Sequence, residues 1–121
     1  MALTPGMSKE VEMPTKAGMG VTHVGPVEML STPSMIGMME GTALKLLQEH
    51  TDGGMPSVGA RIDVRHLAPS PVGKPVKIKA TYIGQDGRQH LFRVQAYFGE
   101  TLIGDGTHWR AVVDPARFAK K

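Results

Sequence analysis

The sequence contains no cysteine, which excludes disulfides, thiolate metal sites, iron–sulfur clusters and a cysteine nucleophile. It has one tryptophan, two tyrosines and three phenylalanines, too few aromatic rings to favour a surface on which nucleic-acid bases stack. No run approaches the roughly 20 apolar residues of a membrane-spanning helix. Residues 1–10 lack the basic and apolar regions of a signal peptide. We therefore expect a cytoplasmic protein that binds neither a membrane nor nucleic acid.

The 121 residues are 40% apolar and 21% charged, values typical of one globular domain that buries its own core. The net charge of +3 is unevenly distributed. Residues 1–60 hold three Lys or Arg and six Asp or Glu, whereas residues 61–121 hold eleven and five. The basic second half favours an anionic partner such as a phosphorylated small molecule. A solvated basic face of a sheet explains the same charges equally well.

A long helix is predicted from Pro33 to His50. Ser31 or Thr32 can cap its N-terminus, and proline suits the first turn of a helix. The Asp-Gly-Gly run at residues 52–54 is a typical signal for the end of a helix. The predicted helix is apolar on nearly all sides, so either a curved sheet or a second subunit must cover more than one of its faces.

Four later segments alternate apolar and polar residues and predict antiparallel strands over residues 58–66, 76–82, 92–98 and 102–113. Asp86-Gly87 is a hairpin signal between the second and third of them. Gly104 and Gly106 in the last strand suggest a bulge or the close approach of another backbone. In the predicted strand over residues 58–66, alternation places five residues on one apolar face: Val58, Ala60, Ile62, Val64 and His66.

The N-terminal part is less regular. Residues 1–18 are expected to form a loose segment that can hold a short edge strand, and residues 20–24 predict a first strand of the domain. One helix against one antiparallel sheet is an α+β architecture. We therefore expect a single α+β domain over residues 19–121.

Glu40 is the most informative candidate for chemistry. It falls inside an apolar stripe of the predicted helix formed by Ile36, Ala43, Leu44 and Leu47. A carboxylate there is costly unless it is paired or neutralised, and burial raises the pKa of such a group, as a general base requires. It can equally act as a nucleophile. The structural alternative is a side chain that reaches the helix edge or pairs with a cation.

His66 and Thr32 are further candidates. His66 ends the apolar face of a predicted strand, where a lone histidine is more often a core residue, but that strand should pack against the helix that carries Glu40. An acid/base pair in one cleft is therefore a hypothesis. Thr32 lies at the helix start, where it can serve as a cap or lie beside free backbone amides that would hold a developing oxyanion.

Other motifs are weaker. His23, His66 and His108 lack the short spacing of metal ligands, so no metal site is predicted. Neither a phosphate-binding loop nor the glycine-flanked serine of α/β-hydrolases occurs. His108 and Arg110 in the last predicted strand can bind phosphate, although packing at a sheet edge explains them more simply.

Several segments together resemble the hotdog-fold acyl-CoA thioesterases, and within them the fluoroacetyl-CoA thioesterase-like group. They are Leu30–Glu40 (LSTPSMIGMME), Val58–His66 (VGARIDVRH), Pro71–Ile78 (PVGKPVKI), Gly104–Arg110 (GDGTHWR) and Arg117-Phe118. The resemblance covers residues 20–118. It rests on the order and spacing of these segments rather than on any single motif.

This resemblance implies a hotdog fold, in which a strongly curved antiparallel sheet wraps one long helix. It implies a homodimer or tetramer with active sites at a subunit interface. The catalytic threonine, glutamate and histidine of the family would be Thr32, Glu40 and His66, and a glycine near the thioester would be Gly59. The implied reaction is hydrolysis of an acyl-CoA thioester, with CoA as part of the substrate and no separate cofactor.

The basic second half suits the phosphates of CoA, for which Arg61 and Arg65 are the first candidates and Lys77 and Lys79 the next. The fluoroacetyl-specific enzyme closes its site with aromatic side chains before the helix. Residues 23–30 contain none, so we expect a general acyl-CoA preference and leave the acyl group open. Two alternatives to hydrolysis remain on this fold: a non-catalytic module that binds acyl-CoA or another small ligand, and a hydratase or dehydratase.

Overall fold

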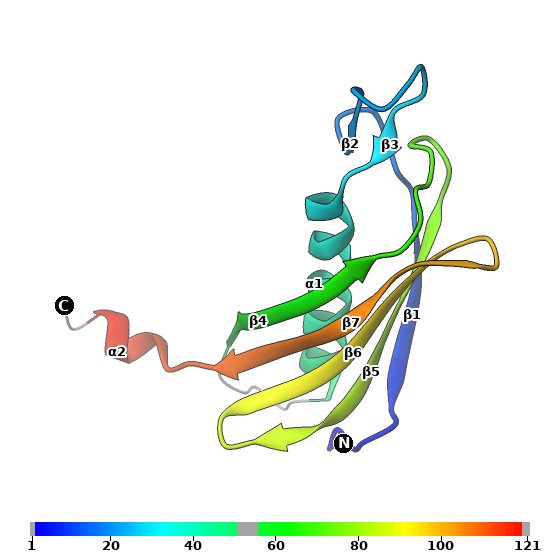
Figure 1. Ribbon diagram of the computed structural model, residues 1–121. Coiled ribbons are helices and arrows are strands. Elements are labelled where there is room, and N and C mark those ends of the chain that lie inside the picture. The colour runs from blue at the N-terminus through cyan, green and yellow to red at the C-terminus, as the bar shows by residue number, and fades with distance from the viewer. Residues whose placement is uncertain (1, 51–55, 120–121) are drawn as a thin grey trace.

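The computed structural model describes residues 2–50 and 56–119. Its elements are β1 (Ser8–Met13), β2 (Gly20–Val21), β3 (Met29–Leu30), α1 (Thr32–Glu49), β4 (Ser57–His66), β5 (Val76–Asp86), β6 (Gln89–Phe98), β7 (Thr101–Val112) and α2 (Pro115–Ala119). Figure 1 shows α1 along one face of a curved sheet, with the short β2–β3 ribbon beside the first turn of the helix. The predicted α+β class is confirmed. No helix in the described ranges is long and apolar enough to cross a membrane.

The main sheet has five antiparallel strands in the order β1-β5-β6-β7-β4. β5 and β6 form a hairpin whose turn is Gly87-Arg88, one residue later than the predicted turn, with Gly87 at a φ of 62°. This left-handed conformation suits glycine, which has no Cβ to clash. β4 pairs only with β7, so its outer edge has no neighbouring strand within the described part of the chain.

The sheet extends into the N-terminal segment that we expected to be loose. Residues 8–13 form the edge strand β1, whose register with β5 runs from Ser8 opposite Thr81 to Met13 opposite Val76. Alternating exposed and half-buried positions along β1 explain why it pairs, since Val11 and Met13 turn toward the domain. The short edge strand that we expected the N-terminal segment to hold is therefore present as β1.

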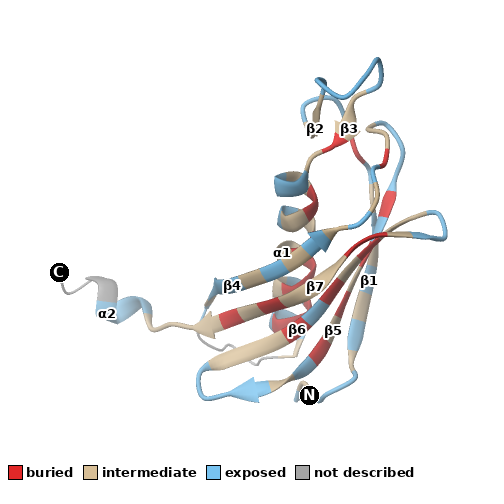
Figure 2. Cartoon of the chain, viewed as in Figure 1, coloured by how far each residue is buried: buried red, intermediate tan, exposed pale blue. Residues whose placement is uncertain are grey.

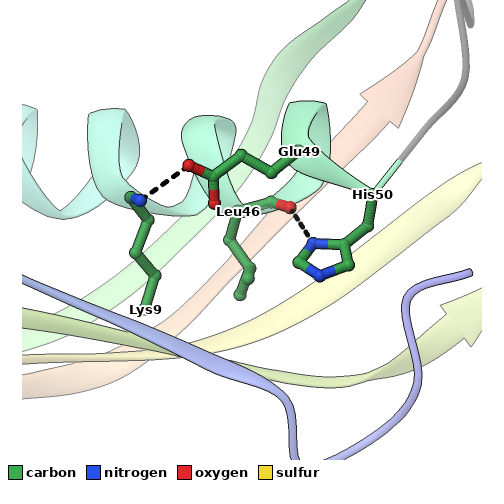
Figure 3. Close-up of polar contacts among 4 residues, drawn as sticks. All are labelled: Lys9, Leu46, Glu49 and His50. Carbon is green, nitrogen blue, oxygen red and sulfur yellow. Dashed lines mark hydrogen bonds and ion pairs between the residues drawn. The ribbon is translucent and has the colours of Figure 1, made fainter. Parts of the chain in front are cut away.

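The helix starts where proline and serine predict. Ser31 is the N-cap, and its Oγ accepts a hydrogen bond from the Ser34 amide at 3.2 Å, while Pro33 lies in the first turn. At the other end, the C-cap is His50, whose Nδ1 lies 2.9 Å from the Leu46 carbonyl oxygen. Figure 3 shows this contact beside the 2.7 Å ion pair that joins Glu49 to Lys9 of β1. The predicted Asp-Gly-Gly end signal at residues 52–54 lies outside the described residues.

The core lies between the helix and the inner face of the sheet, as the burial pattern in Figure 2 shows. The buried helix residues are Met35, Met39, Thr42, Ala43, Leu46 and Leu47. This face is rotated from the predicted stripe, because Met35 and Met39 fill the space above Gly104. A Cβ on Gly104 would lie 2.5 Å from the Met35 sulfur. Glu40 is therefore half-buried at the edge of the packed face and not inside it.

A β-bulge in β4 corrects the predicted faces of that strand. Gly59 lies opposite Arg110 and Arg61 opposite Trp109, so Ala60 is an extra residue in the ladder. Alternation before the bulge is therefore out of phase with alternation after it. Gly59 faces the helix together with the later core-facing residues, whereas Val58 is half-exposed. The expectation that Val58 and Ala60 share the apolar face is wrong.

Gly106 in β7 bears out the predicted close approach of another backbone. A Cβ on Gly106 would collide with the Asp63 carbonyl oxygen and lie 2.5 Å from the Val64 Cα, both in β4. Only a residue without a side chain allows the two strands to approach this closely. β4 is thus held tightly to β7 at the centre of its length.

Candidate active site

Thr32 and His66 form a direct pair. Thr32 is the first residue of α1 and His66 the last of β4, and the Thr32 Oγ1 lies 2.8 Å from the His66 Nδ1. The pair exists because Ser31 caps the helix, which leaves the Thr32 hydroxyl free to bond elsewhere. The sequence-based hypothesis that Thr32 contributes its side chain to a site is therefore compatible with the observed cap.

His66 is neutral at physiological pH, because burial lowers the pKa of its imidazole. Its Nε2 is buried and has no hydrogen-bond partner among the described residues. A buried lone pair without a partner costs less than a buried N–H without one, so the favoured tautomer carries its proton on Nδ1. In that form Nδ1–H donates to Thr32, and the threonine hydroxyl proton is free to be donated to another group.

A cavity of about 620 Å³ opens beside this pair. The β2–β3 segment supplies one wall and the chain after β4 the other. Its lining residues are Val21, His23, Val24, Met29, Leu30, Ser31, Thr32, His66, Leu67, Ala68 and Pro69. A largely apolar cavity with a few convergent polar groups is the usual form of a small-molecule site.

Glu40 belongs to a second polar group, at the other end of β4. A Cβ placed on Gly59 would lie 3.6 Å from the Glu40 Oε2, 3.2 Å from the His108 Cε1 and 3.8 Å from the Arg110 Nη1. The absent side chain of Gly59 therefore leaves an opening toward the Glu40 carboxylate. Glu40 and Gly59, both predicted site residues, are brought together by the bulge in β4.

His108 and Arg110 are buried residues of β7 that also belong to this group, a placement that the sequence did not predict. The His108 Nδ1 lies 2.9 Å from the Arg61 carbonyl oxygen, so it donates, and its Nε2 accepts from the Arg110 Nη1 at 3.1 Å. Arg110 also donates to the Ser57 Oγ at 2.9 Å and to the Ser57 carbonyl oxygen at 3.0 Å. One sequence pattern could have indicated that His108 and Arg110 belong to this group. Both residues follow Gly104 and Gly106 at alternate positions of one strand.

The electrostatics of this group are consistent with a neutral histidine beside a cation. Burial lowers the pKa of His108, and the hydrogen bond to the Arg61 carbonyl and the charge of Glu40 oppose this only in part. Burial also lowers the pKa of the Arg110 guanidinium, opposed by the negative charge of Glu40. Arginine remains protonated despite such a shift. Glu40 thus supplies the compensating charge for a buried arginine.

The two polar groups are separated within one chain. Thr32 and Glu40 are eight residues apart on α1, or about 12 Å along its axis. Gly59 and His66 are seven residues apart on β4, or about 23 Å along an extended strand. The hypothesis that Glu40 and His66 form one acid/base pair stays a prediction. The described residues hold no cluster of three or more His, Asp or Glu side chains able to bind a metal ion.

Arg61 and Arg65 are exposed and lie on the outer face of the sheet, because Ile62 and Val64, which alternate with them, pack toward the core. Arg61 approaches Asp63 at 3.9 Å, and Arg65 lines a shallow outer depression. Neither arginine lines the cavity beside Thr32. Their contact with the phosphates of CoA stays a prediction.

Comparison with known proteins identifies the family of the chain. A sequence profile of the fluoroacetyl-CoA-specific thioesterase family (FlK) matches residues 10–116. The chain belongs to this family. The fluoroacetyl-CoA thioesterase of Streptantibioticus cattleyicolor is 35% identical over 94 residues, which are 78% of this chain and 68% of that protein.

Solved structures of thioesterases have the same fold as this chain. A structure of the fluoroacetyl-CoA thioesterase FlK superposes with a TM-score of 0.87 at 28% identity and covers 99% of this chain and 95% of that one. A thioesterase superfamily member from Thermus thermophilus gives a TM-score of 0.85 at 25% identity, over 98% of this chain and 89% of that one. The predicted hotdog fold and thioesterase class are confirmed.

Proposed function

We propose that the chain hydrolyses acyl-CoA thioesters at a site shared between two copies. The observation that carries the proposal is the placement of Thr32–His66 and of Glu40–Gly59 at opposite ends of β4, whose outer edge pairs with no other strand among the described residues. Family membership supports the reaction, and nothing in the structure favours a binding module or a hydratase instead.

A second copy can complete the site through β4. An unpaired edge strand readily adds a further strand, and a two-fold axis makes the two copies of β4 antiparallel. The Gly59 end of one strand then lies beside the His66 end of the other. The half-exposed Val58 and Leu67 flank the two ends of β4 and would be covered by such pairing. Glu40 of one subunit would thereby face Thr32 and His66 of its partner, twice per dimer.

The chemistry assigns a role to each group. The Glu40 carboxylate removes a proton from a water molecule whose oxygen attacks the thioester carbonyl carbon. The resulting oxyanion is stabilised by the free Thr32 hydroxyl and by backbone amides at the start of α1. The carbon–sulfur bond then breaks, and the proton held by Glu40 passes to the leaving thiolate. The products are a carboxylic acid and CoA.

The remaining residues support these steps. His66 fixes the Thr32 hydroxyl through its Nδ1. Gly59 leaves space for the thioester next to the carboxylate, and the buried Arg110 keeps a positive charge on the other side of Glu40. A misplaced carboxylate could not reach the water, so this environment favours general-base action.

Complementation between two inactive variants tests the shared site. Glu40→Gln and His66→Ala should each lower thiol release from acyl-CoA by about 10²-fold or more. After unfolding and refolding of an equal mixture, half of the dimers contain one chain of each kind, and each has one intact site. Activity should then recover to about a quarter of the wild-type value.

The controls decide between the alternatives. Refolding either variant alone should restore no thiol release. No recovery from the mixture, although mixed dimers form, would refute the shared site. Tight acyl-CoA binding by the wild-type chain without thiol release would favour a binding module, and a changed acyl chain with the thioester intact would indicate a hydratase or dehydratase.

A further inference from the structure

The cavity beside Thr32 and His66 is much larger than the smallest acyl groups. Its volume of about 620 Å³ falls in the range of roughly 300–1,000 Å³ that is usual for sites holding drug-sized ligands. It begins at the paired hydroxyl and imidazole and extends between the β2–β3 segment and residues 67–69. A two-carbon acetyl group attached at the reacting carbonyl would leave most of this space to water.

The walls determine which acyl groups can replace that water. The apolar lining residues are aliphatic or thioether side chains, and none is aromatic: Val21, Val24, Met29, Leu30, Leu67, Ala68 and Pro69. No Asp, Glu, Lys or Arg is among the described residues that line the cavity. A second carboxylate on the acyl group would lose hydration there, and among the described lining residues outside the Thr32–His66 pair only His23 could offer it a counter-charge. The chemistry of the walls therefore selects for neutral hydrocarbon.

The rim of the cavity is apolar as well. Val24 is 59% exposed, and Val27 on the same loop is 47% exposed. Exposed apolar side chains gathered around a concave site are typical of a surface that a ligand covers. They are an independent indication that the cavity receives a chain longer than acetyl.

Hydrogen bonds and a β-bridge hold the cavity wall in place. The Glu28 Oε2 accepts hydrogen bonds from the amides of Gly18 at 3.0 Å and Gly20 at 2.9 Å, which closes the loop that carries β2. Met29 bridges to Pro71 beyond β4, and this joins the two walls. A wall held by such contacts has little conformational freedom to lose on binding, so buried methylene groups contribute to affinity directly.

We infer that the substrate is the CoA thioester of a neutral aliphatic acyl chain longer than acetyl. The inference rests on the proposed function, because it assigns this cavity to the acyl part of the substrate. Burial of each added methylene should raise kcat/KM about fourfold until the cavity is filled. The gain should stop where the chain becomes longer than the cavity.

A substrate series tests the inference, with two readouts that separate it from the proposed function. We would measure kcat/KM of the wild-type protein for straight-chain acyl-CoAs from acetyl to decanoyl, and for succinyl-CoA and benzoyl-CoA. The dissociation constants of the same compounds would be measured by calorimetry with Glu40→Gln. Both series should improve with chain length, with succinyl-CoA and benzoyl-CoA poorer than hexanoyl-CoA.

The outcomes are distinguishable. Equal or falling values from acetyl to hexanoyl in both series would overturn the inference while leaving hydrolysis established. A best substrate with a charged or aromatic acyl group would overturn it too. Absence of thiol release from every compound would refute the proposed function, and the dissociation constants would still show whether the cavity selects aliphatic chains.

A cavity-filling variant tests whether the preference for longer acyl chains arises in this cavity. Val24→Trp places a large ring at an exposed lining position, and it should lower the ratio of kcat/KM for hexanoyl-CoA to that for acetyl-CoA at least about tenfold. Ile83→Trp is the matched control, because Ile83 is 43% exposed on β5 and does not line this cavity. An unchanged ratio in Val24→Trp would place the acyl chain elsewhere.

Discussion

Gly59→Ala should separate catalysis from stability more cleanly than any other single change in this chain. Gly59 has no positive φ, so its backbone accepts alanine without strain. The added methyl would lie 3.2 Å from the His108 Cε1, which requires a shift of a few tenths of an ångström, and 3.6 Å from the Glu40 Oε2, which is ordinary contact. The position that the methyl would take is the opening beside the carboxylate.

The expected change in folding stability is the sum of two opposing contributions. Overpacking by one methyl against buried His108 costs about 1 kcal/mol. The loss of backbone freedom in the unfolded alanine chain offsets about 0.4–1 kcal/mol of that cost. The net change in stability should therefore lie within about 1 kcal/mol, a shift in Tm of no more than about 5 °C. Displacement of the thioester by one methyl should lower kcat about 10²-fold.

The assay is thiol release from hexanoyl-CoA together with thermal unfolding followed by circular dichroism. Gly84→Ala is the matched control, since Gly84 is also a strand glycine and a Cβ on it would meet nothing within 4 Å. It should keep both its activity and its Tm. Wild-type kcat in Gly59→Ala would refute our placement of the reacting thioester, and a loss of activity that follows a loss of folded protein would refute the stability reasoning.

Three further predictions concern pH, the core and the cavity wall. Burial lowers the pKa of His66, His90 and His108. On acidification the unfolded chain therefore binds protons that the folded chain does not bind. The Tm should be constant above about pH 7.5 and should fall as the pH drops below about 6.5. A Tm that rises on acidification would contradict this. Phe92→Ala empties a fully buried position and should cost about 3–5 kcal/mol in urea unfolding, whereas a cost below about 1 kcal/mol would contradict the packing described. Glu28→Ala removes the acceptor that closes the β2 loop and should raise KM for hexanoyl-CoA more than it lowers kcat; the opposite pattern would show that the loop acts in the chemical step.

The sequence predicted the fold well wherever one element produces its own periodic pattern. The helix was placed to within a residue at each end, because Pro33 and the helical spacing of apolar residues depend only on local chemistry. The strands β4 to β7 followed from alternation in the same way. Alternation failed at Ala60, because a bulge arises from the pairing of β4 with β7 and leaves no periodic signal of its own.

The roles of the candidate site residues stay a prediction, and their arrangement could not be predicted from the sequence. Thr32 and His66 pair, and Glu40 lies next to Gly59, but these are two groups and not one. Contacts between distant segments depend on register, which local patterns do not encode. For the same reason the burial of His108 and Arg110 was missed, since it follows from their position across β4 rather than from their neighbours in sequence.

The helix α1 has a mechanical role in the proposed dimer. It carries Thr32 in its first turn and Glu40 two turns later, and these residues would serve different active sites. A hydrogen-bonded helix transmits displacement along its axis nearly as a rigid rod. Any displacement of the Thr32 end at one site would therefore move Glu40 at the other. The two sites of one dimer should report on each other's occupancy, as cooperativity in the dependence of rate on acyl-CoA concentration.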